Sequence, residues 1–134
     1  MKKYINKKDD VALASAECHK LLKECISFDN IEDKELICKN LNRIKDYRSK
    51  LSDAMYSHIE KFVNETIKPI VYDVDYFNFL KRDEFGSYND EGHFVINSDH
   101  SLEMMIFLMY EHTLELNVKL DEFVSKHLYL NIGN

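Results

Sequence analysis

Carboxylate and imidazole side chains gather between residues 73 and 99, and their types suit metal-assisted hydrolysis. Asp73 and Asp75 are separated by one residue, so on a β-strand they point to the same face, about 7 Å apart. With His93 and Asp99 they supply ligands for a divalent cation and its water. No spacing matches an EF-hand or a nuclease motif, and helix capping or an exposed turn also accounts for these residues. A metal-dependent hydrolase is therefore an alternative and not the first prediction.

The remaining candidates for chemistry do not form a known catalytic motif. Cys18 and Cys25 lie two helical turns apart, about 10 Å along the axis, which is too far for a disulfide or a shared metal ion. We interpret both as buried core residues, because free cysteines pack as small hydrophobic side chains. The glycines do not form a phosphate-binding loop before a helix. The sequence thus predicts a non-enzymatic protein without a cofactor.

The elements that position these residues are predicted to be long helices. The chain has 134 residues, enough for one domain (1–134), and only 3 Gly and 1 Pro interrupt it. Apolar residues recur at helical spacing in a first helix that starts at Asp9 or Asp10 and ends after Phe28. A second helical region, 31–68, is either one helix or two that meet at a kink near 45–50. Pro69 is expected to end it.

The C-terminal half mixes a hairpin with one more long helix. Residues 70–80 are either a strand, because they are rich in β-branched and aromatic residues, or a short helix capped by Asp73. Four turn-forming residues at 89–92 lie between two apolar strips, which predicts a β-hairpin around 84–97. The expected fold class is mainly α: a bundle of three to four long helices with this small hairpin.

The last helix is expected to begin at Ser98, Asp99 or Ser101, and its first three turns are apolar nearly all round. Such turns lie either at the centre of the core or against another chain. The methionines and aromatic residues at 104–110 fit both alternatives, and the core interpretation is slightly preferred. The second alternative makes the chain a self-associating helical scaffold.

The charge distribution points to a partner. The net charge is −6, and residues 69–134 carry −8 of charge against +2 for residues 1–68. A negative field repels phosphate backbones, so direct nucleic-acid binding is not expected. The densest apolar stretch, 102–110, is too short to span a membrane, and a cytoplasmic protein is expected. A basic protein is the partner that fits, and whether the chain is a monomer or a homodimer stays open.

Aromatic side chains alternate with the carboxylates of this half. Carboxylates steer the approach of a basic protein and aromatic residues anchor it, which resembles the surface of immunity proteins, antitoxins and phage-type inhibitors. The first prediction is therefore a small acidic binding protein that neutralises a toxin or another nucleic-acid-handling enzyme. The predicted partner-binding residues are Tyr72, Asp73, Asp75, Tyr76, Asp83, Glu84, Tyr88, Asp90 and Glu91.

Overall fold

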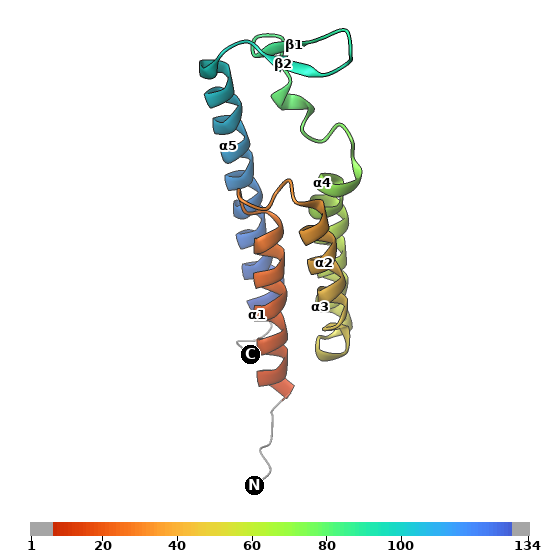
Figure 1. Ribbon diagram of the computed structural model, residues 1–134. Helices are drawn as coiled ribbons and strands as arrows, with labels where there is room; N and C mark the ends of the chain where they lie inside the picture. Colours follow the sequence, from red (N-terminus) through yellow and green to blue (C-terminus); the bar gives the residue numbers. More distant parts are fainter. Residues whose placement is uncertain (1–6, 130–134) are drawn as a thin grey trace.

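The computed structural model describes residues 7–129 and is mainly α with one small β-hairpin, as the sequence predicts (Figure 1). Helix α5 is followed without a break by a π-helical segment, Val124–Tyr129, and α3 and α4 are joined by another, Val63–Ile67. The elements are α1 (Lys7–Cys25), α2 (Lys34–Lys45), α3 (Asp53–Phe62), α4 (Lys68–Tyr72), β1 (Gly86–Tyr88), β2 (Phe94–Ile96) and α5 (Asp99–Phe123).

The second helical region is two helices and not one. Helix α2 begins after Asp33, whose carboxylate accepts a hydrogen bond from the Leu36 backbone N–H at 3.0 Å. It ends at Lys45, and a 3₁₀ turn (Arg48–Lys50) reverses the chain where the kink was expected. Ser52 then caps α3 by accepting a hydrogen bond from the Met55 N–H at 3.1 Å. Side-chain capping therefore fixes the beginning of both helices.

Pro69 does not end the second region, and that prediction was wrong. The helix continues to Tyr72 with Pro69 in the first turn of α4, directly after the π turn. Proline lacks the N–H that a regular helix would use at this position. The π turn loosens the hydrogen-bond ladder just before it, and the N–H of Lys68 bonds to the carbonyl of Val63 instead. A local change of helix type thus accommodates the proline.

Residues 70–80 form no strand. The chain leaves α4 at Asp73, whose carboxylate accepts a hydrogen bond from the Asp75 N–H at 2.9 Å, and a 3₁₀ turn follows at Asn78–Leu80. The capping role expected of Asp73 is therefore present, but it caps a turn and not a helix that runs through Leu80. This segment leads upward from the bundle to the hairpin (Figure 1).

The hairpin forms where the turn residues predict it. Strands β1 and β2 pair antiparallel, with Ser87 opposite Val95. Asn89 closes the connection because its side-chain oxygen accepts hydrogen bonds from the N–H groups of Glu91 and His93. Gly92 has a φ of +83°, in the left-handed region that favours glycine.

The main core joins α1, α2, the α3–α4 helix and the second half of α5. Cys18 and Cys25 are fully buried in it, which confirms their interpretation as core residues, whereas Cys38 is half-buried. The first helix differs at its ends from the expectation: it includes residues 9 and 10, and Phe28 lies beyond it and is 38% exposed.

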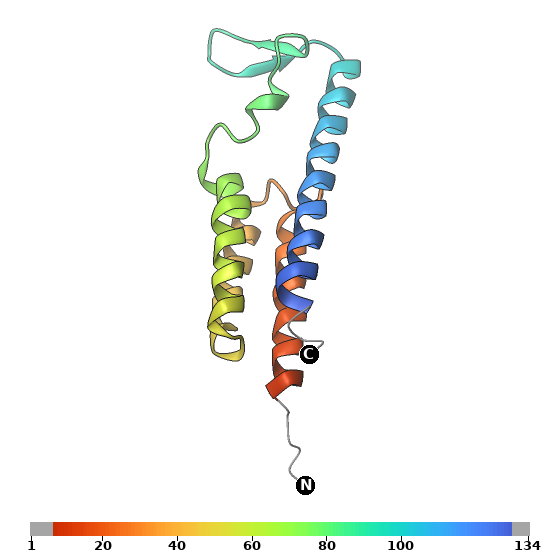
Figure 2. The same cartoon turned by 180° about the vertical axis from the view of Figure 1, so that it is seen from behind.

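The helices of this bundle differ in length, and the difference leaves the first half of α5 without another helix along most of its length. The continuous helix 99–129 spans about 46 Å at 1.5 Å per residue, whereas the α3–α4 helix, 53–72, spans about 30 Å. The excess of about 16 Å corresponds to roughly eleven residues. In Figures 1 and 2 the first half of α5 rises past the ends of α1 and α4 and carries the hairpin at its tip.

Candidate functional site

The part of the chain that extends beyond the bundle is residues 73–112, which we call the acidic arm. It contains the segment after α4, the hairpin and the first half of α5. The boundary falls in α5 at Thr113: from there on Thr113, Leu116, Leu120 and Phe123 are buried, whereas no α5 residue before Thr113 is. The buried face of α5 is therefore confined to its second half, and Leu102 at its beginning is 42% exposed.

The first half of α5 exposes large apolar side chains to solvent. Five of them keep between 39% and 51% of their surface exposed: Leu102, Met104, Ile106, Phe107 and Tyr110. This overturns the preferred interpretation of the stretch 104–110 as core filling, although Met109 does pack against the core. Apolar helical turns that stand outside a core are typical of helices that another chain covers.

The exposed large apolar residues of the arm lie on several sides of α5 and on the hairpin, and their summed exposed area approaches what one partner contributes to an interface. With roughly 200 Å² for a large side chain, the five α5 residues present on the order of 450 Å². Tyr88 and Val95 on the hairpin are also at least half exposed and raise this to about 650 Å². One partner in a standard protein–protein interface contributes about 800 Å².

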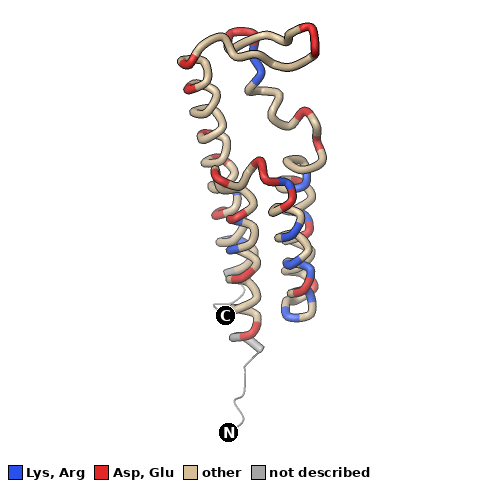
Figure 3. Tube along the Cα trace, in the orientation of Figure 1, with Lys and Arg blue, Asp and Glu red and all other residues tan. Residues whose placement is uncertain are grey.

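The arm is strongly acidic. Residues 73–112 contain nine Asp and Glu residues and two Lys and Arg residues, which leaves a net charge of −7. All nine carboxylates belong to exposed residues. Figure 3 shows them spread over the segment after α4, the hairpin and α5, and not gathered at one point. The charge therefore acts as a field around the whole arm, which attracts cations from a distance.

The predicted acidic residues lie in three places on this arm. Asp73 and Asp75 are in the segment that leaves α4, and Asp90 and Glu91 form the tip of the hairpin. Asp83 and Glu84 lie just before β1. Two of these carboxylates have cationic or titratable neighbours. Glu84 forms an exposed ion pair with Arg82 at 3.3 Å, and Glu91 lies 3.6 Å from the imidazole of His93.

The predicted aromatic residues are less uniform. Tyr72, at the end of α4, and Tyr88, on β1, are exposed and available to a partner. Tyr88 packs edge-on against Phe94 across the hairpin, with ring centroids 5.4 Å apart. Tyr76 is half-buried and packs against the main core. Tyr76 therefore lies at the base of the arm, where the arm meets the bundle, and it is less available to a partner than Tyr72 and Tyr88.

A hydrogen bond between Tyr76 and His112 ties the base of the arm to α5. The Tyr76 hydroxyl lies 2.6 Å from Nε2 of His112. Burial raises the pKa of Tyr76 to about 12 and lowers the pKa of His112, so at neutral pH the phenol donates and the neutral imidazole accepts. Both groups are thus held in uncharged forms that suit a structural bond.

The arm has a small buried cluster of its own, separate from the main core. Leu80 and Phe85 are buried there, outside the cluster that fills the bundle. Arg82 lies over the Phe85 ring at 6.0 Å, and the Phe85 carbonyl accepts a hydrogen bond from the Asn97 N–H. Gly86 follows directly, and a Cβ atom there would stand 2.1 Å from the Val95 carbonyl oxygen, so only glycine fits.

The alternative metal site is not assembled. Within the described residues, no group of three or more His, Cys, Asp or Glu side chains is placed to hold a metal ion. Asp73 caps a turn by accepting a hydrogen bond from the Asp75 N–H. His93 is beside Glu91 in the hairpin, and Asp99 is in the first turn of α5. The structure therefore does not bring together the four side chains proposed for a hydrolase.

Sequence reasoning gave a partner surface at 104–110 only as the less preferred alternative and left these α5 side chains out of the predicted binding residues. Their signal was the apolar character of the first three turns on every side, which distinguishes Met104, Ile106 and Phe107 from the one-sided pattern of a core helix. That pattern alone does not distinguish a helix at the centre of the core from a helix whose apolar turns are exposed and can bind another chain. The lengths of the neighbouring helices decide between the two.

The fold and the arm define a mainly α protein with an exposed, acidic and apolar projection. Comparison of the chain with known protein families, curated proteins and solved structures found no match. Among the described helices, none combines the length and apolar character needed to cross a lipid bilayer.

Proposed function

We propose that this protein is a non-enzymatic binding protein whose acidic arm docks onto a basic protein and blocks it. The observation that carries the proposal is the exposed apolar half of α5, surrounded by a net charge of −7. A toxin nuclease, or another enzyme that handles nucleic acid, has the positive surface that such an arm complements.

The charge and the apolar side chains of the arm contribute to binding in different ways. The carboxylates at the hairpin tip and after α4, including Asp73, Asp75, Asp90 and Glu91, attract a basic protein over several ångströms and raise the association rate. Phe107 and Tyr110 then supply the large apolar contacts that determine how long the complex lasts, because aromatic anchors dominate interface energies. Substitutions of the two kinds are therefore expected to act on different rate constants.

The test compares what three forms of the protein capture from an extract of the native host. The first is the wild type. The second, the arm variant, carries Asp73→Lys, Asp75→Lys, Asp90→Lys and Glu91→Lys. The control variant carries the same four-fold reversal at exposed residues of the bundle. These are Glu32→Lys, Glu65→Lys, Asp121→Lys and Glu122→Lys. Both variants change the net charge equally.

The proposal expects one basic protein to be enriched on the wild type and the control variant and lost from the arm variant. With that protein purified, the association rate should fall at least tenfold between about 50 and 300 mM salt. Phe107→Ala should raise the dissociation rate and leave the association rate nearly unchanged. Equal capture by the arm and control variants would contradict the proposal, as would an association rate that salt does not change.

Self-association through α5 is the second candidate, and the same exposed apolar turns favour it. Two arms repel each other at low ionic strength, so a homodimer would become stronger as salt is added. A complex with a basic protein would become weaker. Sedimentation velocity at about 20 and 500 mM salt separates the two candidates. Salt-promoted dimers that Phe107→Ala abolishes would favour the scaffold, and a monomer at both salt concentrations favours the inhibitor.

A further inference from the structure

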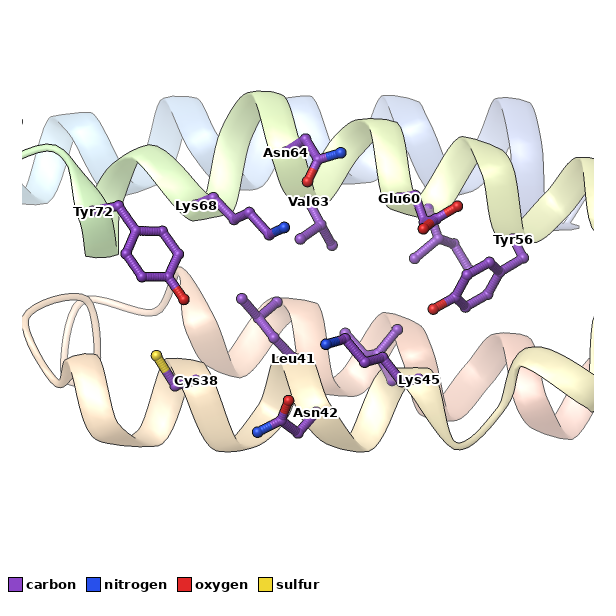
Figure 4. A pocket seen from close by; sticks show the side chains of 12 residues that line it. Cys38, Leu41, Asn42, Lys45, Tyr56, Glu60, Val63, Asn64, Lys68 and Tyr72 are labelled. Carbon is purple, nitrogen blue, oxygen red and sulfur yellow. The ribbon is translucent and has the colours of Figure 1, made fainter.

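A groove separates α2 from the α3–α4 helix on the bundle, away from the apolar half of α5. It encloses about 180 Å³ and is lined by twelve residues from these two walls. Its floor is apolar, because Leu41 and Ile44 of α2 and Ile59 and Val63 of the opposite wall are buried. Polar side chains form the rim (Figure 4).

Two lysines reach into this groove from opposite walls. Lys45 extends from α2 and Lys68 from the start of α4, and in Figure 4 both chains run toward the middle of the groove, between Leu41 and Val63. Neither lysine forms an ion pair with any side chain in the described part of the chain. Glu60 stands on the rim as well and is equally unpaired there.

Two ammonium groups line this groove against one carboxylate, that of Glu60, so its charged side chains carry a net positive charge. No lysine of the described residues forms an ion pair, so Lys45 and Lys68 are distinguished by lining the same groove, where their like charges repel. A dianion placed between Lys45 and Lys68 would remove the repulsion and gain two charge-assisted hydrogen bonds. The groove therefore has the electrostatics of an anion site.

The backbone of one wall is also unusual at this point. The π turn Val63–Ile67 forms the middle of the wall and brings both Val63 and Asn64 to the groove. Single π turns inside α-helices occur often at functional sites, because the widened turn shifts side chains away from their regular positions. Here the turn combines an apolar floor residue with an amide that can donate hydrogen bonds.

We propose that this groove binds a phosphate monoester with a small apolar body. The phosphate lies between Lys45 and Lys68, Asn64 donates a hydrogen bond to it, and the apolar part rests on Leu41 and Val63. The volume of about 180 Å³ is below the range of about 300–1,000 Å³ found for drug-sized ligands. A single ring with one phosphate is therefore the class of ligand that fits.

The experiment titrates the ¹⁵N-labelled protein with phenyl phosphate in a low-salt buffer without phosphate and follows the amide signals. Saturable shifts are expected on both walls, at Asn42 and Asn64. Inorganic phosphate lacks the apolar body and benzyl alcohol lacks the charge, so each should bind at least tenfold more weakly. Shifts confined to other parts of the protein, or binding of inorganic phosphate as tight as that of phenyl phosphate, would overturn the proposal.

Matched variants test the two lysines. Lys45→Met with Lys68→Met should weaken phenyl phosphate binding at least tenfold. Lys39→Met with Lys50→Met removes the same charge from exposed positions that do not line the groove and should leave binding unchanged. Glu60→Gln should tighten binding, because it removes a negative charge from the rim. Equal affinity in the two lysine variants would mean that the site does not exist as described.

Discussion

Leucines of α5 allow a direct test of which part of the helix the core covers. Leu116 is 3% exposed and Leu114, two residues earlier, is 48% exposed. Replacing a buried leucine by alanine costs about 2–5 kcal/mol, because the transfer free energy of the side chain is lost and a cavity remains. About half of the Leu114 surface is already in water and its removal leaves no enclosed cavity, so Leu114→Ala should cost about 1 kcal/mol or less.

The comparison isolates burial because both variants make the same change in the same helix. Leucine and alanine have similar helix propensities, so intrinsic preference contributes little to the difference. Urea unfolding followed by circular dichroism gives both free energies of unfolding, and we expect Leu116→Ala to lose at least 2 kcal/mol more than Leu114→Ala. Leu102→Ala, in the arm, should behave like Leu114→Ala. A loss at 102 as large as the loss at 116 would show that the first half of α5 is covered within the monomer and would refute the account of the arm.

Three further outcomes follow from contacts of the arm and the bundle. Gly86→Ala should abolish the cross-strand nuclear Overhauser effects of the hairpin, because no Cβ fits there, whereas Ser87→Ala on the same strand should retain them. Tyr76→Phe should destabilise the protein by about 1 kcal/mol, with Tyr76→Ala costing more, since the first removes only the hydrogen bond to His112. Stability should fall between about pH 7.5 and 5.5, because burial lowers the pKa of His112 and His127 in the folded state below the unfolded value of about 6.5. The unfolded chain then binds more protons as the pH drops, and His112→Asn should reduce this loss; a urea midpoint independent of pH would contradict it.

Much of the fold was predictable because its signals are local. The hairpin follows from the turn residues around Asn89 and Gly92, and the start of α5 follows from a serine at 98 that accepts the Ser101 N–H. Such features depend on a few neighbouring residues, and one sequence is enough to recognise them. The seam of α1 was predictable for the same reason, because its core positions repeat every three or four residues.

The predictions that failed concern long-range contacts or backbone conformations that the neighbouring residues in the sequence do not indicate. A proline inside a helix ordinarily breaks it, and the residues around Pro69 do not predict the π turn that lets this helix continue. Whether Phe107 is buried depends on where α1 and α4 end, which is a property of other segments of the chain. The Tyr76–His112 bond joins residues 36 positions apart and appears only once the arm has folded back onto α5. The acidic residues were found by composition, whereas their spread over the arm required coordinates.

The charge of the arm explains how an exposed apolar helix can remain available to a partner. Treating two arms as seven net negative charges each, at a mean separation of about 20 Å, the repulsion is about 5 kcal/mol at 0.01 M salt and about 1 kcal/mol at 0.15 M. Burial of apolar side chains such as Phe107 must exceed this repulsion before two copies associate through their arms. A basic protein meets the same field with the opposite sign, so the charge that opposes self-association assists the complex. The carboxylates therefore determine which proteins can bind the apolar turns of α5. Reversing their charge should lower the affinity for a basic protein and raise the affinity of two copies for each other.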